Sequence, residues 1–258
     1  MTAPRPDLKK QRIYMKKIYN GIRRRIRDLI LQFRKRWVLL TFKNSKPASP
    51  EWLIGKEIQY GGLVTDVPRR KVSDSDPRSA KELAMGGMIG GDRMLHHGYA
   101  SSYSKHLLPF ASGSWAGNFV EVGILKGSGL AIWCDLFPKA RVMGFDIDLS
   151  HTRENLPYLK SEGAFQEGEP ELFEFDQFKG NRSYLAGILN GSKIEICVDD
   201  GLHSDESIMK TLASVWPNLA DHFVYFVEDN FNIGDEIQKK YLDCQVVRDG
   251  ELTVLLRG

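Results

Sequence analysis

Two short stretches of this 258-residue chain concentrate side chains that could bind a cation and move a proton. One reads CVDDGLHSDE and contains Asp199, Asp200 and His203; the other reads FVEDN and contains Glu228 and Asp229. Each follows an apolar run that predicts a buried strand. Four carboxylates at neighbouring strand ends would repel one another strongly unless a cation lay between them. The two stretches therefore predict a metal site.

The residue types narrow the chemistry of that site. Carboxylate oxygens without a cysteine cluster favour Mg²⁺, with Mn²⁺ or Ca²⁺ as alternatives. His203, with an unperturbed imidazole pKa of about 6.5, is suited to accept a proton. The alternative is structural: the acids would only cap the following helices, because Asp is a good N-cap residue.

A glycine-rich turn upstream predicts a cofactor site. FVEVGILKGSGLAIW places Glu121, Gly123 and Gly127 between an expected strand and an expected helix. Glycine lets the backbone turn tightly and approach a ligand closely. The next expected strand ends in GFDID, where Asp146, or alternatively Asp148, could accept hydrogen bonds from ribose hydroxyls. The spacing differs from the G-x-G-x-x-G of dinucleotide binders, and a purely structural turn is the alternative.

Strands alternate with helices from Tyr99 onward, which implies a parallel sheet covered on both faces. An Asp-Gly turn within 244–257 indicates a terminal hairpin. The predicted class is α/β: a doubly wound Rossmann-like sheet, mostly parallel, with a C-terminal antiparallel hairpin strand and an N-terminal basic helix. We expect strands at 117–124, 140–148, 193–200 and 222–230, and helices at 101–111, 127–137, 181–189 and 206–219.

Charge divides the chain unequally. Residues 1–46 hold 15 Lys or Arg and 2 acidic residues, a net charge of +13, so the remainder carries −10 within an overall +3. We divide the chain into a basic amphipathic arm (1–46), a linker and acceptor-side segment (47–98) and a catalytic domain (99–258). The Pro/Ser-rich stretch 44–52 predicts a linker.

Apolar residues of the arm recur at intervals of three and four, which makes one helical stripe within 9–43. The helix could dock on its own domain or on a second subunit, giving a homo-oligomer, or lie in an anionic membrane surface. Nucleic acid is less favoured, because no aromatic stacking pattern accompanies the charge. The stripe comprises Ile18, Ile22, Ile26, Leu29, Ile30, Phe33 and Trp37.

The remaining composition favours the cytoplasm. The three cysteines form no close-spaced pair and predict reduced thiols. No apolar run is long enough for a membrane span, and none predicts a secretory signal. We expect a cytoplasmic protein, peripheral on the inner face of the cell membrane if the arm binds lipid.

The glycine turn together with the acid of the second strand resembles the class I S-adenosylmethionine-dependent methyltransferases. The resemblance implies that Glu121 and Gly123 lie near the methionine part of the cofactor and that Asp146 holds the ribose. Further cofactor contacts implied by it are Gly127, Asp199, and Asp176 and Gln177 near the adenine.

A narrower resemblance covers roughly residues 86–231: GGDRMLHHGYASSYSKHLLPF, VDDGLHSDE and FVEDN are similar to motifs of the macrolide-sugar O-methyltransferases of the macrocin and mycinamicin type. It implies Asp200, Glu228 and Asp229 as metal ligands and His203 as general base, with Asp200 beside it in the catalytic pair. The chain departs from the family by Arg93 in place of Lys and Leu202 in place of Ser. Asn230 could replace Glu228 as a ligand, as in catechol-type methyltransferases.

These resemblances imply an S-adenosylmethionine-dependent, Mg²⁺-assisted O-methyltransferase. Its acceptor would be a sugar hydroxyl of a glycan, a glycolipid or a glycosylated natural product. A catechol-like small diol is the alternative acceptor, and a membrane-tethered protein that keeps the fold without turnover is the alternative function. The Asp-Asp-Gly-x-His motif also resembles that of proteins named cephalosporin hydroxylases, so it does not define the substrate.

Overall fold

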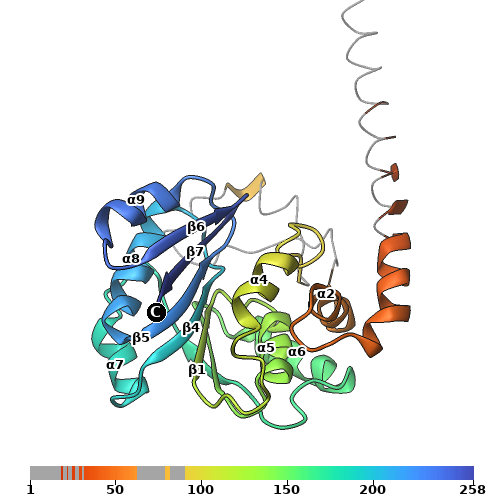
Figure 1. The fold of residues 1–258 in the computed structure, drawn as a ribbon, viewed down its shortest axis with the longest axis horizontal. Coiled ribbons are helices and arrows are strands. Elements are labelled where there is room, and N and C mark those ends of the chain that lie inside the picture. Colours follow the sequence, from red (N-terminus) through yellow and green to blue (C-terminus); the bar gives the residue numbers. More distant parts are fainter. Residues whose placement is uncertain are drawn as a thin grey trace, which may run out of the picture.

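In the computed structural model, residues 32–62, 79–81 and 91–258 are described, together with Tyr19, Ile22, Arg25, Ile26, Leu29 and Ile30. A seven-stranded sheet with the order β3-β2-β1-β4-β5-β7-β6 forms the centre (Figure 1). Its strands are β1 (Asn118–Val122), β2 (Arg141–Asp146), β3 (Glu171–Glu174), β4 (Ile194–Asp199), β5 (Leu219–Val227), β6 (Gln245–Asp249) and β7 (Leu252–Arg257).

All pairs from β3 to β5 are parallel, and β7 runs antiparallel to both β5 and β6. The order reverses between β1 and β4, which makes that point the switch of a doubly wound sheet. The predicted α/β class, the mostly parallel sheet and the antiparallel hairpin strand are confirmed.

Helices cover both faces of the sheet, each against its own apolar cluster (Figure 1). On one face lie α2 (Pro50–Gln59), α4 (Ala100–Leu107), α5 (Ser128–Leu136) and α6 (Ser150–Ser161); on the other lie α7 (Arg182–Leu189), α8 (Asp205–Val215) and α9 (Ile233–Lys240). Short 3₁₀ turns occur at Phe42–Asn44 and Trp216–Asn218.

Three helices differ from the expectation. The linker prediction for 44–52 is wrong at its end, because Ser49 caps α2 by accepting the Trp52 N–H and Pro50 occupies the first helical turn. The sequence analysis also predicts neither α6, which contains Pro157, nor α9. Residues 32–41 of the arm are helical, whereas Ile18 lies outside the described residues.

Candidate active site

The predicted cofactor and metal residues lie at the carboxyl ends of β1 to β5 or in the loops that follow these strands. Because β4 lies between β1 and β5, the loops after these three strands meet there. Gly123 has a φ of 85°, and a Cβ on it would lie 2.1 Å from the backbone oxygen of Asp200. Only glycine fits this position, so the predicted cofactor turn and the first acidic loop are in direct contact.

Asp146 supports the glycine turn from the end of β2. Its Oδ2 accepts hydrogen bonds from the backbone N–H groups of Ile124 and Leu125 at 3.0 and 2.9 Å. Asp148 instead accepts from the backbone and the hydroxyl of Ser150, at the start of α6. The ribose contact predicted for Asp146 stays a prediction; the structure shows that the carboxylate is positioned beside the turn.

Glu121 is a completely buried carboxylate beside this turn. Burial raises its pKa, and the charge of Arg93 opposes that rise. The ion pair between Arg93 Nη2 and Glu121 Oε1 measures 2.6 Å but lacks hydrogen-bond geometry. Within the described part of the chain, both Glu121 oxygens and Arg93 Nη1 have no hydrogen-bond partner. The Glu121 carboxylate and Arg93 Nη1 could therefore still form hydrogen bonds with a ligand. An amino-acid-like ligand carries an ammonium group and a carboxylate that match them.

Arg93 contacts Glu121 and two of the four acids for which the sequence predicts a neutralising metal, Asp200 and Glu228. Besides Glu121, its Nη2 lies 2.7 Å from Asp200 Oδ2 and its Nε lies 3.1 Å from Glu228 Oε1. Burial lowers the pKa of Arg93, but the charges of these three acids raise it well above its usual value. Arg93 is 5% exposed, so the chain supplies an internal cation that the sequence analysis noted only as a departure from the family motif.

The segment that carries Arg93 is anchored by α2. The fully buried Glu57 accepts the backbone N–H groups of Met94 and Leu95 at 2.8 and 2.9 Å. Burial raises the pKa of Glu57 to about 7, although these two donors lower it. The position of Arg93 therefore depends on a second buried acid outside the sheet.

Three side chains form a group that could hold a divalent cation: Asp200, His203 and Asp229 offer ligand atoms within 4.8 Å of one another. Arg93 contacts Oδ2 of Asp200, while Oδ1 lies 3.8 Å from His203 Nε2. Tyr99 donates its hydroxyl to Oδ1 of Asp229 at 2.8 Å, while Oδ2 lies 3.9 Å from His203 Nε2. Each carboxylate thus has one oxygen held by the protein and one facing His203, an arrangement that suits Mg²⁺ or Mn²⁺.

The orientation of His203 is determined by a backbone carbonyl. Its Nδ1 lies 3.3 Å from the oxygen of Glu228, and because a carbonyl only accepts, we assign the hydrogen to Nδ1. Nε2 is then the ring nitrogen that faces Asp200 and Asp229. His203 and Asp229 have φ values of 63° and 56°, a left-handed backbone that is costly for these residues and concentrates at functional sites.

A second group of possible ligands comprises His97, Asp229 and Glu251. Acids face both ring nitrogens of His97: Nδ1 lies 3.2 Å from Glu251 and 3.4 Å from Asp229, and Nε2 lies 3.7 Å from Asp92. Hydrogen bonding to Asp92, together with the charge of Asp229, raises the pKa of His97 to about 9. An imidazolium therefore balances this group at neutral pH. The sequence analysis missed His97, although HHGY lies within the lead-in motif.

Glu228 and Asn230, the alternative third ligands, are both engaged by the protein. Glu228 is 2% exposed and, besides Arg93, accepts the hydroxyl of Tyr103. Asn230 donates to the backbone oxygen of His203 at 3.0 Å and accepts the N–H groups that begin α9. The structure brings His203, rather than either of these, next to Asp200 and Asp229; a ligand role for Glu228 or Asn230 stays a prediction.

The remaining predicted cofactor residues lie between β3, β4 and α8. Gln177 donates to Asp199 Oδ1 at 3.0 Å and to Thr211 at 2.8 Å. Burial raises the pKa of Asp199 to about 7, and Tyr225 donates to its other oxygen at 3.3 Å. Asp176 accepts the backbone N–H of Phe178 at 3.0 Å. Their cofactor roles stay predictions, because each described contact is made within the chain. Gly127 begins α5 with a φ of 74°.

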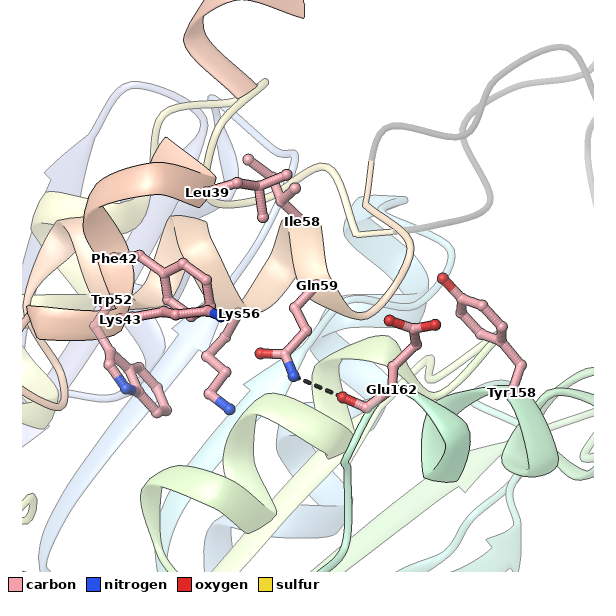
Figure 2. Close-up of a pocket in the computed structure, with 9 residues that line it drawn as sticks. All are labelled: Leu39, Phe42, Lys43, Trp52, Lys56, Ile58, Gln59, Tyr158 and Glu162. Atoms are coloured by element: carbon pink, nitrogen blue, oxygen red, sulfur yellow. Dashed lines mark hydrogen bonds between the residues drawn. The ribbon is translucent and has the colours of Figure 1, made fainter. Parts of the chain in front are cut away.

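A pocket of about 720 Å³ lies elsewhere, between the end of the arm, α2 and α6 (Figure 2). Two of its polar side chains are paired within the protein: Lys56 contacts Asp135 at 2.7 Å, and Gln59 donates to the backbone oxygen of Glu162 at 2.6 Å. No predicted cofactor or metal residue lines it. We therefore assign the candidate site to the carboxyl edge of the sheet.

Comparison with known proteins supports a methyltransferase resemblance. The chain is 28% identical over 169 residues to the 8-demethyl-8-alpha-L-rhamnosyl tetracenomycin-C 2'-O-methyltransferase of Streptomyces olivaceus, a match that covers 62% of this chain and 40% of that protein. The chain resembles a sugar O-methyltransferase, as its sequence predicts. It spans about 40% of the length of this curated relative. No protein-family model matches it.

Two solved structures are also similar. One is the MycE methyltransferase from mycinamycin biosynthesis, in complex with Mg, SAH and mycinamycin VI, with 18% identity and a TM-score of 0.49 over 64% of this chain and 50% of that one. The other is a putative caffeoyl-CoA O-methyltransferase from Staphylococcus aureus, with 12% identity and a TM-score of 0.46 over 60% of this chain and 80% of that one.

Proposed function

We propose that this chain transfers the methyl group of S-adenosylmethionine to a hydroxyl of a sugar-containing acceptor, with the help of a divalent cation such as Mg²⁺. The observation that carries the proposal is the contact between the glycine turn after β1 and the loop that bears Asp200 and His203. It places a cofactor-type turn beside a group that can bind a cation and accept a proton. The named activity of the Streptomyces olivaceus relative supports the sugar acceptor.

The cofactor fits the carboxyl edge through its amino-acid end. Glu121 Oε1 is paired with Arg93, while its buried Oε2 has no hydrogen-bond partner in the described chain and suits an ammonium group. Arg93 Nη1 is a buried donor without such a partner and suits a carboxylate. When bound, S-adenosylmethionine supplies an electrophilic methyl group on a positively charged sulfur.

The cation would be held by Asp200 and Asp229, and His203, the third member of the group, would stay uncoordinated so that its Nε2 can accept a proton. A bound Mg²⁺ would lower the pKa of an acceptor hydroxyl. His203 is assigned as the general base: Nε2 takes the proton from the hydroxyl, and the Glu228 carbonyl holds the ring in the required tautomer. Arg93 keeps Asp200 oriented and balances the acids that lie nearest to it.

The acceptor is a sugar hydroxyl of a glycan, a glycolipid or a glycosylated natural product. The test is transfer of labelled methyl groups to a series of such acceptors, beginning with rhamnosides because the Streptomyces relative is named for a rhamnosyl 2'-hydroxyl. Isothermal titration with S-adenosylmethionine measures cofactor binding separately. EDTA should abolish transfer, readdition of Mg²⁺ should restore it, and cofactor binding should persist throughout. Absence of cofactor binding by the folded protein, or transfer that resists chelation, would contradict the proposal.

His203→Asn tests the base, since Asn tolerates the left-handed backbone at this position but cannot accept the proton. We expect kcat to fall by about 10²–10⁴-fold, while the cofactor Kd stays within a few fold. The matched control is His222→Ala, an exposed histidine on β5, which should leave both quantities unchanged. Near-normal turnover in His203→Asn would exclude the assignment.

A further inference from the structure

The helical arm docks on the domain through one side only. Val38 is buried in a small cluster with Phe42, Ile58 of α2 and Leu95. Lys35 donates to the backbone oxygen of Gly62 at 3.3 Å. These contacts fasten the end of the arm beside α2, as Figure 1 shows.

The apolar residues of the arm lie on a different side of the helix. At 3.6 residues per turn they fall within an arc of about 100°, and Val38 lies outside that arc. Each is between 52% and 78% exposed, so the stripe does not pack on its own domain. This apolar stripe comprises Ile22, Ile26, Leu29, Ile30, Phe33, Trp37 and Leu40.

Cations accompany the apolar stripe without acidic partners. The net charge of residues 1–46 is +13, with Asp28 as the one acid after Asp7. Among the described residues, neither Arg34 nor Arg36 contacts a carboxylate, although exposed ion pairs form elsewhere in the molecule. The described residues of the arm therefore form an exposed amphipathic helix, and the sequence of the arm is strongly cationic.

We infer that the arm binds the surface of an anionic lipid bilayer, with the apolar stripe in the interfacial layer and the flanking cations against the headgroups. The bilayer surface is favoured over other partners because its negative charge complements the positive charge of the arm. A second copy of the arm would bring another +13 against the first, and nucleic acid would leave the apolar stripe in water. No described helix is long and apolar enough to cross a membrane.

Sedimentation of the full chain with vesicles tests the inference. Vesicles of phosphatidylcholine with phosphatidylglycerol should bind it at least about tenfold more tightly than phosphatidylcholine alone, and salt should weaken the binding. Equal binding to both vesicles, or binding to neither, would overturn the inference.

Variants then separate the two parts of the arm. Phe33→Ser combined with Leu40→Ser removes exposed apolar area, and Arg34→Gln combined with Arg36→Gln removes charge; each should lower the affinity for anionic vesicles at least severalfold. Leu242→Ser, at a leucine that is 81% exposed on the domain, is the matched control and should bind as the wild type does. Undiminished binding by both arm variants would overturn the inference. So would a dimer in size-exclusion chromatography that Phe33→Ser with Leu40→Ser converts to monomer, because the apolar stripe would then face a second copy.

Trp37 reports insertion directly. It is 69% exposed, whereas Trp52 and Trp133 are buried, so lipid should shift its fluorescence to the blue. Trp37→Phe should abolish that shift and keep vesicle binding; a shift that survives the substitution contradicts insertion of the apolar stripe. Cofactor titration on the same preparations distinguishes a failure of this inference from a failure of the proposed function.

Discussion

The arm and the carboxyl edge of the sheet both concentrate charge of one sign, and they handle it in opposite ways. At the sheet edge, Arg93 lies within 3.1 Å of three acids, and His97 lies between further acids. On the arm, Arg34 and Arg36 are exposed next to an exposed apolar stripe. Charge that is neutralised inside the fold stabilises it, whereas charge left unpaired on the outside is available to a partner.

Buried and exposed charges also contribute differently to the free energy of unfolding. A buried carboxylate that loses its cation carries a large desolvation cost, while an exposed cation is well solvated and contributes little to folding. Substitutions at the sheet edge should therefore change stability, and substitutions on the arm should change association. The following predictions test that separation.

Arg93→Met should have the largest effect. It leaves the buried Glu121 and Glu228 and the partly exposed Asp200 without their cation, and we expect the unfolding free energy at neutral pH to fall by about 3–5 kcal/mol. Urea denaturation measures this. The loss should shrink in acid, because protonated carboxyls no longer need the guanidinium.

The matched control is Arg248→Met, whose partner Asp235 is 70% exposed. We expect a loss below about 1 kcal/mol there. An equal effect of the two substitutions would remove the distinction between buried and exposed charge in this molecule.

Glu57 offers a pH-dependent test of the same region. Its pKa is raised from 4.5 to about 7 by burial, so the folded state keeps a proton that the unfolded state releases in this interval. This contribution to stability is complete below pH 4.5 and is lost as pH rises to about 7. It amounts to roughly 3 kcal/mol at most.

Glu57→Gln removes the titration and turns an amide donor toward a backbone N–H. At low pH the variant should be less stable than the wild type by about 1–3 kcal/mol. This difference should narrow as the pH approaches 7. A difference that is constant with pH, measured by urea denaturation in a series of buffers, would show that Glu57 does not titrate in this interval.

Arg34→Gln combined with Arg36→Gln should have the smallest effect on folding. Because neither guanidinium contacts a carboxylate in the described chain, the unfolding free energy should change by no more than about 0.5 kcal/mol. Thermal and urea unfolding check this without lipid. A larger loss would mean that the arm, like the sheet edge, uses its charge within the fold.

Much of the sheet could be predicted from sequence because its signals are local. Apolar runs of strand length, the glycine turn at Gly123 and the Asp-Gly hairpin each depend on adjacent residues. The start of α2 was also locally encoded, since Ser49 followed by Pro50 is a helix-start signal; the Pro/Ser composition of the stretch obscured it. α6 was not predicted because Pro157, which lies inside it, argues against a helix.

The hydrogen bonds and ion pairs of the site could not be predicted, because they join residues that are far apart in the chain. Arg93 meets Asp200 across 107 positions, and Tyr103 meets Glu228 across 125. Side-chain types predict a cation to balance the acids, but they do not predict that a guanidinium of the chain itself also contacts two of them. Only the tertiary arrangement shows that part of this charge is balanced from within.

The origin of Arg93 bears on where the autonomous folding unit begins. The sheet and its covering helices other than α2 start after residue 99, yet the guanidinium that balances their buried acids belongs to the segment before α4, which Glu57 of α2 anchors. A fragment cut at residue 99 would contain every described strand and lack this counterion. Such a fragment should be recovered better when the missing segment is supplied in trans as a peptide, so that the smallest complementing peptide would mark the boundary of the domain.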